Sequence, residues 1–140
     1  MENHLYGEPV VWGPEQQQSF DELKKCLSSA KTLGYFAKNT PTNVIADASP
    51  VGLGAVLVQQ QGEELRVISY ASHSLFNTER LYLQTEKEAL AILWSCERFD
   101  AYLYGREFEL VTDHKPLDCV FSPKSKTCAR IERWLVRMQP

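Results

Sequence analysis

Three apolar runs of strand length, separated by short polar segments, constrain the fold of this chain more than any other feature. The runs cover residues 43–47, 52–59 and 65–71. Between the second and the third lies Gln61-Gly62, a turn sequence flanked by apolar residues, which is a good hairpin signal. We therefore predict three consecutive antiparallel strands.

A long helical pattern follows the third strand. From about Thr78 to Leu103, apolar residues recur at steps of three and four, so they share one buried stripe. The stripe contains Ala89, Ile92, Leu93, Cys96, Phe99 and Leu103. Gly105 ends the helix, and residues 107–112 form a fourth strand.

This order of elements predicts the fold class. A helix between two strands of one sheet is a crossover, so the fourth strand returns parallel to the first and can lie next to it. The chain is predicted to be an α/β protein with a mixed sheet. Three antiparallel strands come first, and the crossover helix and the parallel fourth strand follow.

Further helices flank this arrangement. Pro14-Glu15 opens a first helix that ends before Gly34 and the breaker sequence Asn39-Thr40-Pro41. After the fourth strand, Pro116 suits the first position of a short helix, and a last helix runs over about 127–138. The first helix carries apolar residues at helical spacing, namely Phe20, Leu23, Cys26 and Leu27. The inward residues of the last helix are Ile131, Trp134, Leu135 and Met138.

Three acidic residues lie where these elements would meet. Asp47 ends the first strand, Asp113 ends the fourth, and Glu88 directly precedes the apolar stripe of the crossover helix. Neighbouring parallel strands open at their carboxyl ends, where ligands bind. Carboxylates that converge repel one another unless a divalent cation neutralises them, so this placement predicts a magnesium site.

Each acidic residue also has an ordinary structural interpretation. Asp47 precedes Ala48-Ser49-Pro50 and could form a turn. Glu88 could be a solvated helix residue, and Asp113 could cap the helix that starts at Pro116. Only the joint placement of the three favours a functional site.

Glycines and histidines give weaker signals. No helix follows Gly52 and Gly54, so they do not form a phosphate-binding loop. They fit a strand start that another backbone, or a ligand backbone, approaches closely. His73 and His114 are far apart in sequence and lack a third metal ligand at suitable spacing, so we expect a loop or supporting role for each.

Composition limits the classes of protein to which this chain can belong. A chain of 140 residues, 44% of them hydrophobic, has the size of one domain with a real core. It has no run of 18 apolar residues, so no membrane contact is expected, and residues 1–5 do not resemble a signal peptide. Its cysteines form no C-x-x-C pair, so we expect reduced thiols in an intracellular protein. The cysteines are Cys26, Cys96, Cys119 and Cys128.

Charge is unevenly distributed along the chain. The net charge of −3 argues mildly against a protein that coats nucleic acid on its own. From residue 115 onward, however, basic residues outnumber Asp118 and Glu132. This segment could meet a phosphate backbone or form a solvated helix face. Its basic residues are Lys115, Lys124, Lys126, Arg130, Arg133 and Arg137.

These segments together resemble the ribonuclease H domain of gypsy-type LTR-retrotransposon reverse transcriptases. The similarity keeps the order of the family's motifs and spans most of the chain. The matching segments are Trp12 with 19–24, Ala46-Asp47-Ala48-Ser49, 52–57, Tyr70-Ala71-Ser72, 86–92, 102–106 and 112–117.

The resemblance implies a domain organisation and a chemistry. Residues 1–40 would be a connecting segment with one helix, and residues 41–140 a ribonuclease H-like domain. The family hydrolyses the RNA strand of RNA–DNA hybrids with two Mg²⁺ ions, and Mn²⁺ is an alternative ion. Its members recognise the hybrid by 2′-hydroxyls and groove shape.

The resemblance also implies roles for the three acidic residues. Asp47 would bridge both metal ions, while Glu88 and Asp113 would hold the second. Glu88 is preferred to Glu86 because Glu88 precedes the Ala89-Leu90-Ala91-Ile92 segment that matches the family.

The family has a fourth carboxylate, an Asp beyond a fifth strand, and no Asp or Glu follows Glu132 in this sequence. We therefore expect a domain truncated before its C-terminal strand and helix, with weak or absent nuclease activity. An exposed fourth-strand edge carrying Phe108, Leu110 and Thr112 would favour self-association.

Two functions follow as alternatives. The first is a metal-dependent ribonuclease H-type endonuclease within a reverse transcriptase polyprotein, with the RNA–DNA hybrid and the rest of that polyprotein as partners. The second is a non-catalytic, retroelement-derived binding or structural module. In either case we expect a cytoplasmic or nuclear location, or one in a retrotransposon particle.

Overall fold

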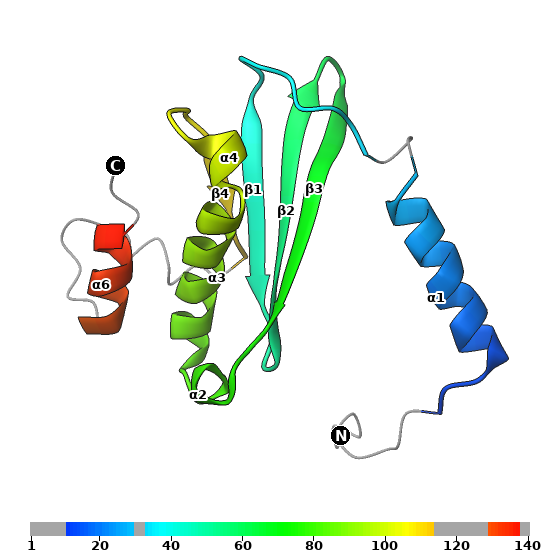
Figure 1. Cartoon of the computed structure of the whole chain (residues 1–140), viewed down its shortest axis with the longest axis horizontal. Coiled ribbons are helices and arrows are strands. Elements are labelled where there is room, and N and C mark those ends of the chain that lie inside the picture. Colours follow the sequence, from blue (N-terminus) through cyan, green and yellow to red (C-terminus); the bar gives the residue numbers. More distant parts are fainter. Residues whose placement is uncertain (1–10, 30–32, 114–128, 138–140) are drawn as a thin grey trace. The chain divides into compact units, whose positions relative to one another are not determined.

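The structure, a computed structural model, describes residues 11–29, 33–113 and 129–137 (Figure 1). The chain divides into two compact units, Met1–Leu33 and Gly34–Pro140. Among the described residues, no helix has the length and apolar character needed to cross a membrane. The division at residue 40 into a connecting segment and a domain stays a prediction.

The first unit contains helix α1, Pro14–Leu27, which begins at the predicted proline. The backbone N–H of Gly13 donates to Gln16 Oε1 at 3.0 Å and so satisfies a donor just before the helix. The apolar residues Phe20, Leu23 and Leu27 are 39–56% exposed. The predicted stripe therefore exists, but it is not buried.

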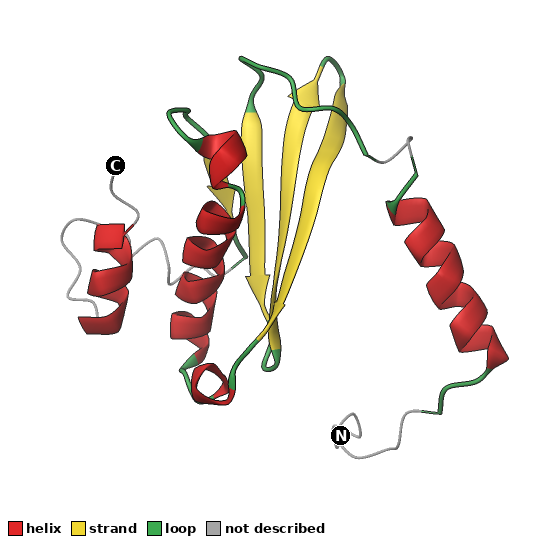
Figure 2. Ribbon diagram, in the orientation of Figure 1, coloured by secondary structure: helices red, strands yellow, loops and turns green. Residues whose placement is uncertain are grey.

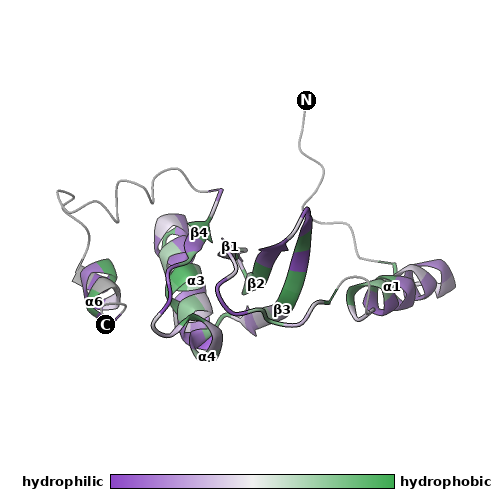
Figure 3. Cartoon of the chain, turned by 90° about the horizontal axis from the view of Figure 1, so that it is seen from above, coloured by the Kyte–Doolittle hydropathy of each residue, from purple (hydrophilic) through white to green (hydrophobic). Residues whose placement is uncertain are grey.

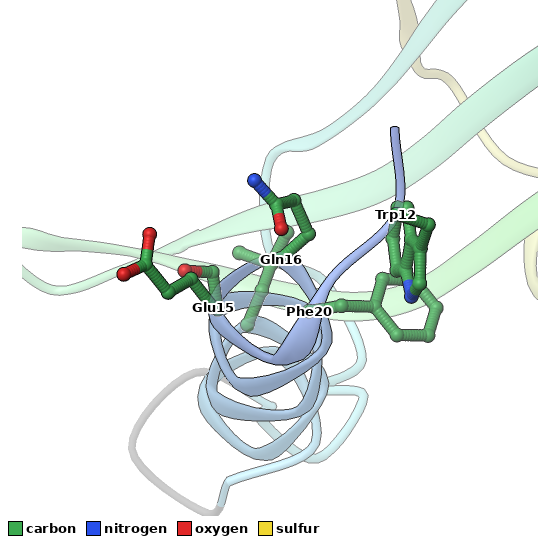
Figure 4. A pocket seen from close by; sticks show the side chains of 6 residues that line it. Trp12, Glu15, Gln16 and Phe20 are labelled. Carbon is green, nitrogen blue, oxygen red and sulfur yellow. The ribbon is translucent and has the colours of Figure 1, made fainter. Parts of the chain in front are cut away.

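Trp12 packs beside the start of α1. Its ring meets Phe20 edge-on, with ring centroids 5.8 Å apart, and its indole Nε1 donates to Gln17 Oε1 at 2.9 Å. Figure 4 shows these two rings beside a shallow hollow that Glu15 and Gln16 also line. This local packing orders the chain just before the helix.

The second unit is built on a four-stranded sheet with the strand order β3-β2-β1-β4. The strands are β1 Thr42–Ala48, β2 Gly52–Gln61, β3 Glu64–Ser74 and β4 Glu109–Val111. β1 pairs antiparallel with β2 and parallel with β4, and β2 pairs antiparallel with β3. Gly62 occupies the hairpin turn with φ +66°, a conformation that glycine adopts without steric cost. The predicted mixed sheet is confirmed.

Alternation along β1 separates the two faces of the sheet. Val44, Ala46 and Ala48 are buried, while Ile45 and Asp47 between them are exposed. Since successive strand residues point to opposite faces, the buried set faces the helices. Asp47 alternates with this set and is exposed, one position before the end of the strand.

Helix α3, Gln84–Arg98, covers one face of this sheet, and α4, Asp100–Leu103, continues it (Figure 2). The single turn α2, Asn77–Arg80, precedes α3 at the end of the sheet. Apolar positions recur along the strands and on α3 in Figure 3. Two core clusters join these layers, and their buried members from α3 onward are Ala89, Ala91, Ile92, Phe99, Leu103 and Ile131.

The prediction of one continuous helix from Thr78 to Leu103 was wrong. Leu83 has extended backbone angles, φ −62° and ψ 155°, and separates α2 from α3. Two side chains satisfy backbone donors before these helices. Glu79 Oε2 accepts from the N–H of Phe76 at 2.8 Å, and Glu86 Oε2 accepts from the N–H of Leu83 at 3.0 Å. The first cap stabilises the helix start that was predicted near Thr78, and the second stabilises a further start at Gln84 that the apolar pattern did not predict.

Helix α6, Ala129–Arg137, packs against α3. Ile131 is 4% exposed and joins the core, and Trp134 is half-buried against it. These two inward positions agree with the predicted last helix. The predicted short helix at Pro116, the Leu135 side chain and Met138 lie outside what the structure describes.

Strand β4 is shorter than the predicted 107–112, because only residues 109–111 pair with residues 43–45 of β1. Within the described ranges, β1 is the one strand that pairs with it. Leu110 and Val111 are 39% and 41% exposed. Self-association through this edge stays a prediction.

Candidate metal site at the carboxyl ends of β1 and β4

Asp47 is held by the sheet. It pairs with Gly54 of β2, one position before the end of β1. The turn that follows is made by Ser49, whose hydroxyl accepts from the N–H of Gly52 at 2.9 Å and donates to its carbonyl oxygen at 3.0 Å. Because Ser49 supplies these turn contacts, the interpretation of Asp47 as a turn former loses its support.

Glu88 lies in the second turn of α3 and is only 4% exposed. Its Oε1 accepts a hydrogen bond from Gln84 Nε2 at 2.5 Å. The interpretation of Glu88 as a solvated surface residue is therefore wrong. A buried carboxylate requires compensating contacts, because losing its hydration is costly.

Asp113 follows β4 by two residues. The parallel pairing of Val111 with Ile45 brings the ends of β4 and β1 side by side, and Asp113 is exposed. Its alternative role as a cap of a helix at Pro116 concerns residues outside the described ranges.

The structure brings these three side chains together. Asp47, Glu88 and Asp113 each offer one carboxylate oxygen, and these oxygens lie within 4.8 Å of one another. Oxygen ligands of Mg²⁺ lie about 2.0–2.1 Å from the ion, so two ligands of one ion are at most about 4.2 Å apart. In two-metal sites the ions themselves are about 3.5–4 Å apart. The cluster thus has the donor type that divalent cations prefer, and its spread of up to 4.8 Å, wider than the ligands of one Mg²⁺ allow, suits a pair of ions.

Glu86, the other candidate on α3, is engaged elsewhere. Its Oε1 pairs with Arg130 Nη1 of α6 at 2.7 Å, and its Oε2 caps the start of α3. The Arg130 guanidinium also lies over the Tyr82 ring, 4.1 Å from the centroid. Glu86 therefore connects α3 to α6, and Glu88 faces the other two acids.

Within the described residues, two basic side chains of the C-terminal segment pair with acids of α3, and whether the segment also meets a phosphate backbone stays a prediction. Arg130 pairs with Glu86, and Arg137 pairs with Glu97. Arg133 is exposed on α6. The lysines of this segment, Lys115, Lys124 and Lys126, lie outside the described residues.

His73 lies on β3 and belongs to a local cluster. Its Nε2 is 3.5 Å from Glu79 Oε2, and its ring packs near Phe76 and Trp94 at centroid distances of 5.3 and 5.8 Å. The carboxylate cluster does not include it. A supporting role agrees with this position, and His114 lies outside the described residues.

The two glycines at the start of β2 differ. A Cβ atom at Gly52 would lie 3.0 Å from the carbonyl oxygen of His73, so another backbone approaches closely there, as predicted. At Gly54, beside Asp47, a Cβ atom would meet no atom within 4 Å. The fold requires glycine at the first position and not at the second.

Sequence reasoning missed Gln84 and Ser49. Gln84 precedes Glu88 by four residues, a spacing that places two side chains on one helix face. This four-residue spacing was the signal in the sequence that could have indicated their contact. The role of Ser49 depends on the turn conformation, for which the sequence alone gave no specific indication.

Comparisons with known proteins assign the family. Residues 37–140 match the RNase H-like domain found in reverse transcriptase. The chain is 37% identical over 132 residues to the retrovirus-related Pol polyprotein from transposon opus of Drosophila melanogaster, covering 94% of this chain. It is 44% identical over 124 residues to that from transposon 297 of the same organism, covering 89% of this chain. The chain spans only 13% and 11% of the length of these relatives.

Solved structures show the same fold. The foamy viral protease-reverse transcriptase dRH in complex with double-stranded DNA matches with a TM-score of 0.70 at 23% identity, covering 94% of this chain and 25% of that chain. The foamy viral protease-reverse transcriptase in complex with an RNA/DNA hybrid matches with a TM-score of 0.57 at 22% identity, covering 95% of this chain and 18% of that chain. With the family match and the Pol relatives, the conclusion is that this chain belongs to the RNase H-like domains of gypsy-type retrotransposon reverse transcriptases.

Proposed function

We propose that this chain hydrolyses the RNA strand of RNA–DNA hybrids in a metal-dependent reaction, as one part of a reverse transcriptase polyprotein. The observation that carries the proposal is the cluster of Asp47, Glu88 and Asp113, with carboxylate oxygens within 4.8 Å. Family membership supports the reaction type. Foamy viral protease-reverse transcriptase, which shares this fold, has been captured with an RNA/DNA hybrid.

The three carboxylates would hold two divalent cations, Mg²⁺ or Mn²⁺. Asp47 would be a ligand of both ions, and Glu88 and Asp113 would hold the second. Bound ions of this kind lower the pKa of a coordinated water and stabilise the leaving oxygen of a phosphodiester.

The protein contributes the fixed geometry of the ligands. Parallel pairing of β1 with β4 sets the distance between the two aspartates, and α3 brings Glu88 to the same point from the helical layer. Because ordered strands and a helix hold the ligands, little conformational entropy is lost when a cation binds. The exposed aspartates keep the cluster open to a large substrate.

The test compares Asp47→Asn with the unchanged chain. Millimolar Mg²⁺ or Mn²⁺ should raise the Tm of the unchanged chain, because a ligand that binds the folded state stabilises it. Asp47→Asn should abolish this rise and leave the metal-free Tm equal or slightly higher, since one repelling charge is removed. Calorimetry measures both effects, and Glu63→Gln at the hairpin serves as the charge-matched control.

Activity is measured on a labelled RNA–DNA hybrid, with single-stranded RNA and double-stranded DNA as controls. Assays use the 140-residue chain and a version that continues along its natural reading frame. Metal-dependent cleavage of the hybrid in either version, lost in Asp47→Asn, supports the proposal. Hybrid binding with no cleavage in both would favour the non-catalytic module.

A further inference from the structure

Gln84, the first residue of α3, connects the two elements that carry Glu88 and Asp47. Its Nε2 donates to Glu88 Oε1 at 2.5 Å and to the carbonyl oxygen of Ala48 at 3.2 Å. Ala48 directly follows Asp47 in β1. Since a side-chain amide carries two N–H donors, this one group contacts the helix carboxylate and the strand end simultaneously.

The start of the helix does not account for the conformation of Gln84. The N–H of Leu83 is capped by Glu86, so Gln84 is not needed for that contact. Gln84 and Glu88 are separated by four residues and therefore lie on the same face of α3. The amide is directed at the carboxylate cluster.

An uncharged donor suits this position. Glu88 is 4% exposed, and a buried carboxylate is stabilised in its charged form by a hydrogen bond. A lysine or arginine donor would add a positive charge next to a cation site and oppose cation binding. An amide stabilises the carboxylate without that repulsion.

We propose that Gln84 is a positioning residue, which fixes the Glu88 carboxylate relative to Asp47 for cation binding. The proposal rests on the metal-dependent function proposed above. In this arrangement Gln84 does not contact the cation. It holds one ligand at the correct distance from the other two by joining the first turn of α3 to the end of β1.

The experiment measures the Kd of Mn²⁺ alone by titration calorimetry at 25 °C, together with the metal-free Tm. Gln84→Leu should weaken Mn²⁺ binding at least tenfold. The matched control is Gln18→Leu, which removes the equivalent contact from Gln18 Nε2 to Glu22 Oε1, 2.9 Å, in α1. Gln18→Leu should leave the Kd unchanged. If Gln84 only stabilised the fold, its replacement would lower the Tm and leave the Kd of the folded protein unaltered.

Gln84→Met separates shape from hydrogen bonding, because it keeps the unbranched chain and removes the donors. It should weaken Mn²⁺ binding as Gln84→Leu does. An unchanged Kd in either Gln84 variant, while the unchanged protein binds Mn²⁺, overturns the role of Gln84 and leaves the proposed function standing. No Mn²⁺ binding by the unchanged protein would overturn both.

Discussion

Glutamates on two sides of helix α3 have partners of different charge. Toward α6, Glu86 pairs with Arg130 and Glu97 pairs with Arg137. Toward the strand ends, Glu88 accepts a hydrogen bond from an uncharged amide and lies with two more carboxylates within 4.8 Å. Arginine neutralises the acids on the first side, whereas on the second side we propose that a divalent cation does so.

Neighbouring residues of one short helical segment therefore serve two purposes. Glu86 and Glu88 are two residues apart, about 200° around a helix with 3.6 residues per turn, so they face opposite directions. Glu86 attaches α6 to α3, and Glu88 contributes to the candidate metal site. The tertiary partner, rather than the residue type, decides which role each acid has.

The largest effect is expected from removing the arginine on the α6 side. Arg130→Met should lower the free energy of unfolding by about 1–3 kcal/mol, because the variant loses an ion pair and a cation–π contact and leaves a partly buried Glu86. Urea denaturation measures the change. Mn²⁺ affinity should stay the same if the two sides of α3 are independent.

Arg133→Met is the control, since Arg133 is exposed on the same helix. Its effect should remain within about 0.5 kcal/mol. If Arg130→Met lost Mn²⁺ binding while the protein was still folded, the α6 side of α3 would support the carboxylate site. The two sides of α3 would then not be independent.

A smaller effect is expected at the paired glycines near Asp47. Gly52→Ala should destabilise the protein by about 1–2 kcal/mol, because the new Cβ would lie 3.0 Å from the carbonyl oxygen of His73. Gly54→Ala should stabilise it by up to about 1 kcal/mol, since alanine loses less backbone freedom on folding than glycine does. Thermal or urea unfolding gives both values. Equal effects at the two positions would contradict the structure.

The smallest effect concerns Cys96 on α3, where burial raises the pKa of the thiol to about 11. The thiolate is the reactive form, so at pH 8 Cys96 should react with iodoacetamide more slowly than the exposed Cys26. Its rate should still be rising at pH 9–10, below that pKa. Peptide mapping by mass spectrometry follows the two sites separately. Faster reaction of Cys96 in Arg130→Met would indicate that α6 protects this side of α3.

Local patterns predicted most of the sheet correctly. Alternation and the Gln61-Gly62 turn located β1, β2 and β3, because period-two burial and glycine turns are properties of short segments. The same local logic failed at Leu83. The apolar pattern around it predicted one helix, and the break is stabilised by Glu86, whose Oε2 accepts from the N–H of Leu83.

The candidate site was predicted through the order of elements. Parallel return of the fourth strand placed Asp113 near Asp47, and the structure confirms that Glu88 joins them in space. Their function as metal ligands stays a prediction. Gln84 was not predicted, because its contact with Ala48 spans 36 positions of sequence and depends on how α3 sits against β1.

The positions of strands, turns and the apolar face of α3 follow from local sequence, since they depend on steric preferences and on burial over a few residues. The partner of each polar group depends on the tertiary fold. In the folded chain Arg130 pairs with Glu86, and Gln84 donates a hydrogen bond to Glu88. The exposed Asp47 lies close to Asp113, which follows β4. Electrostatic and hydrogen-bond contacts act over a few ångströms in space, and separation along the chain does not specify such distances.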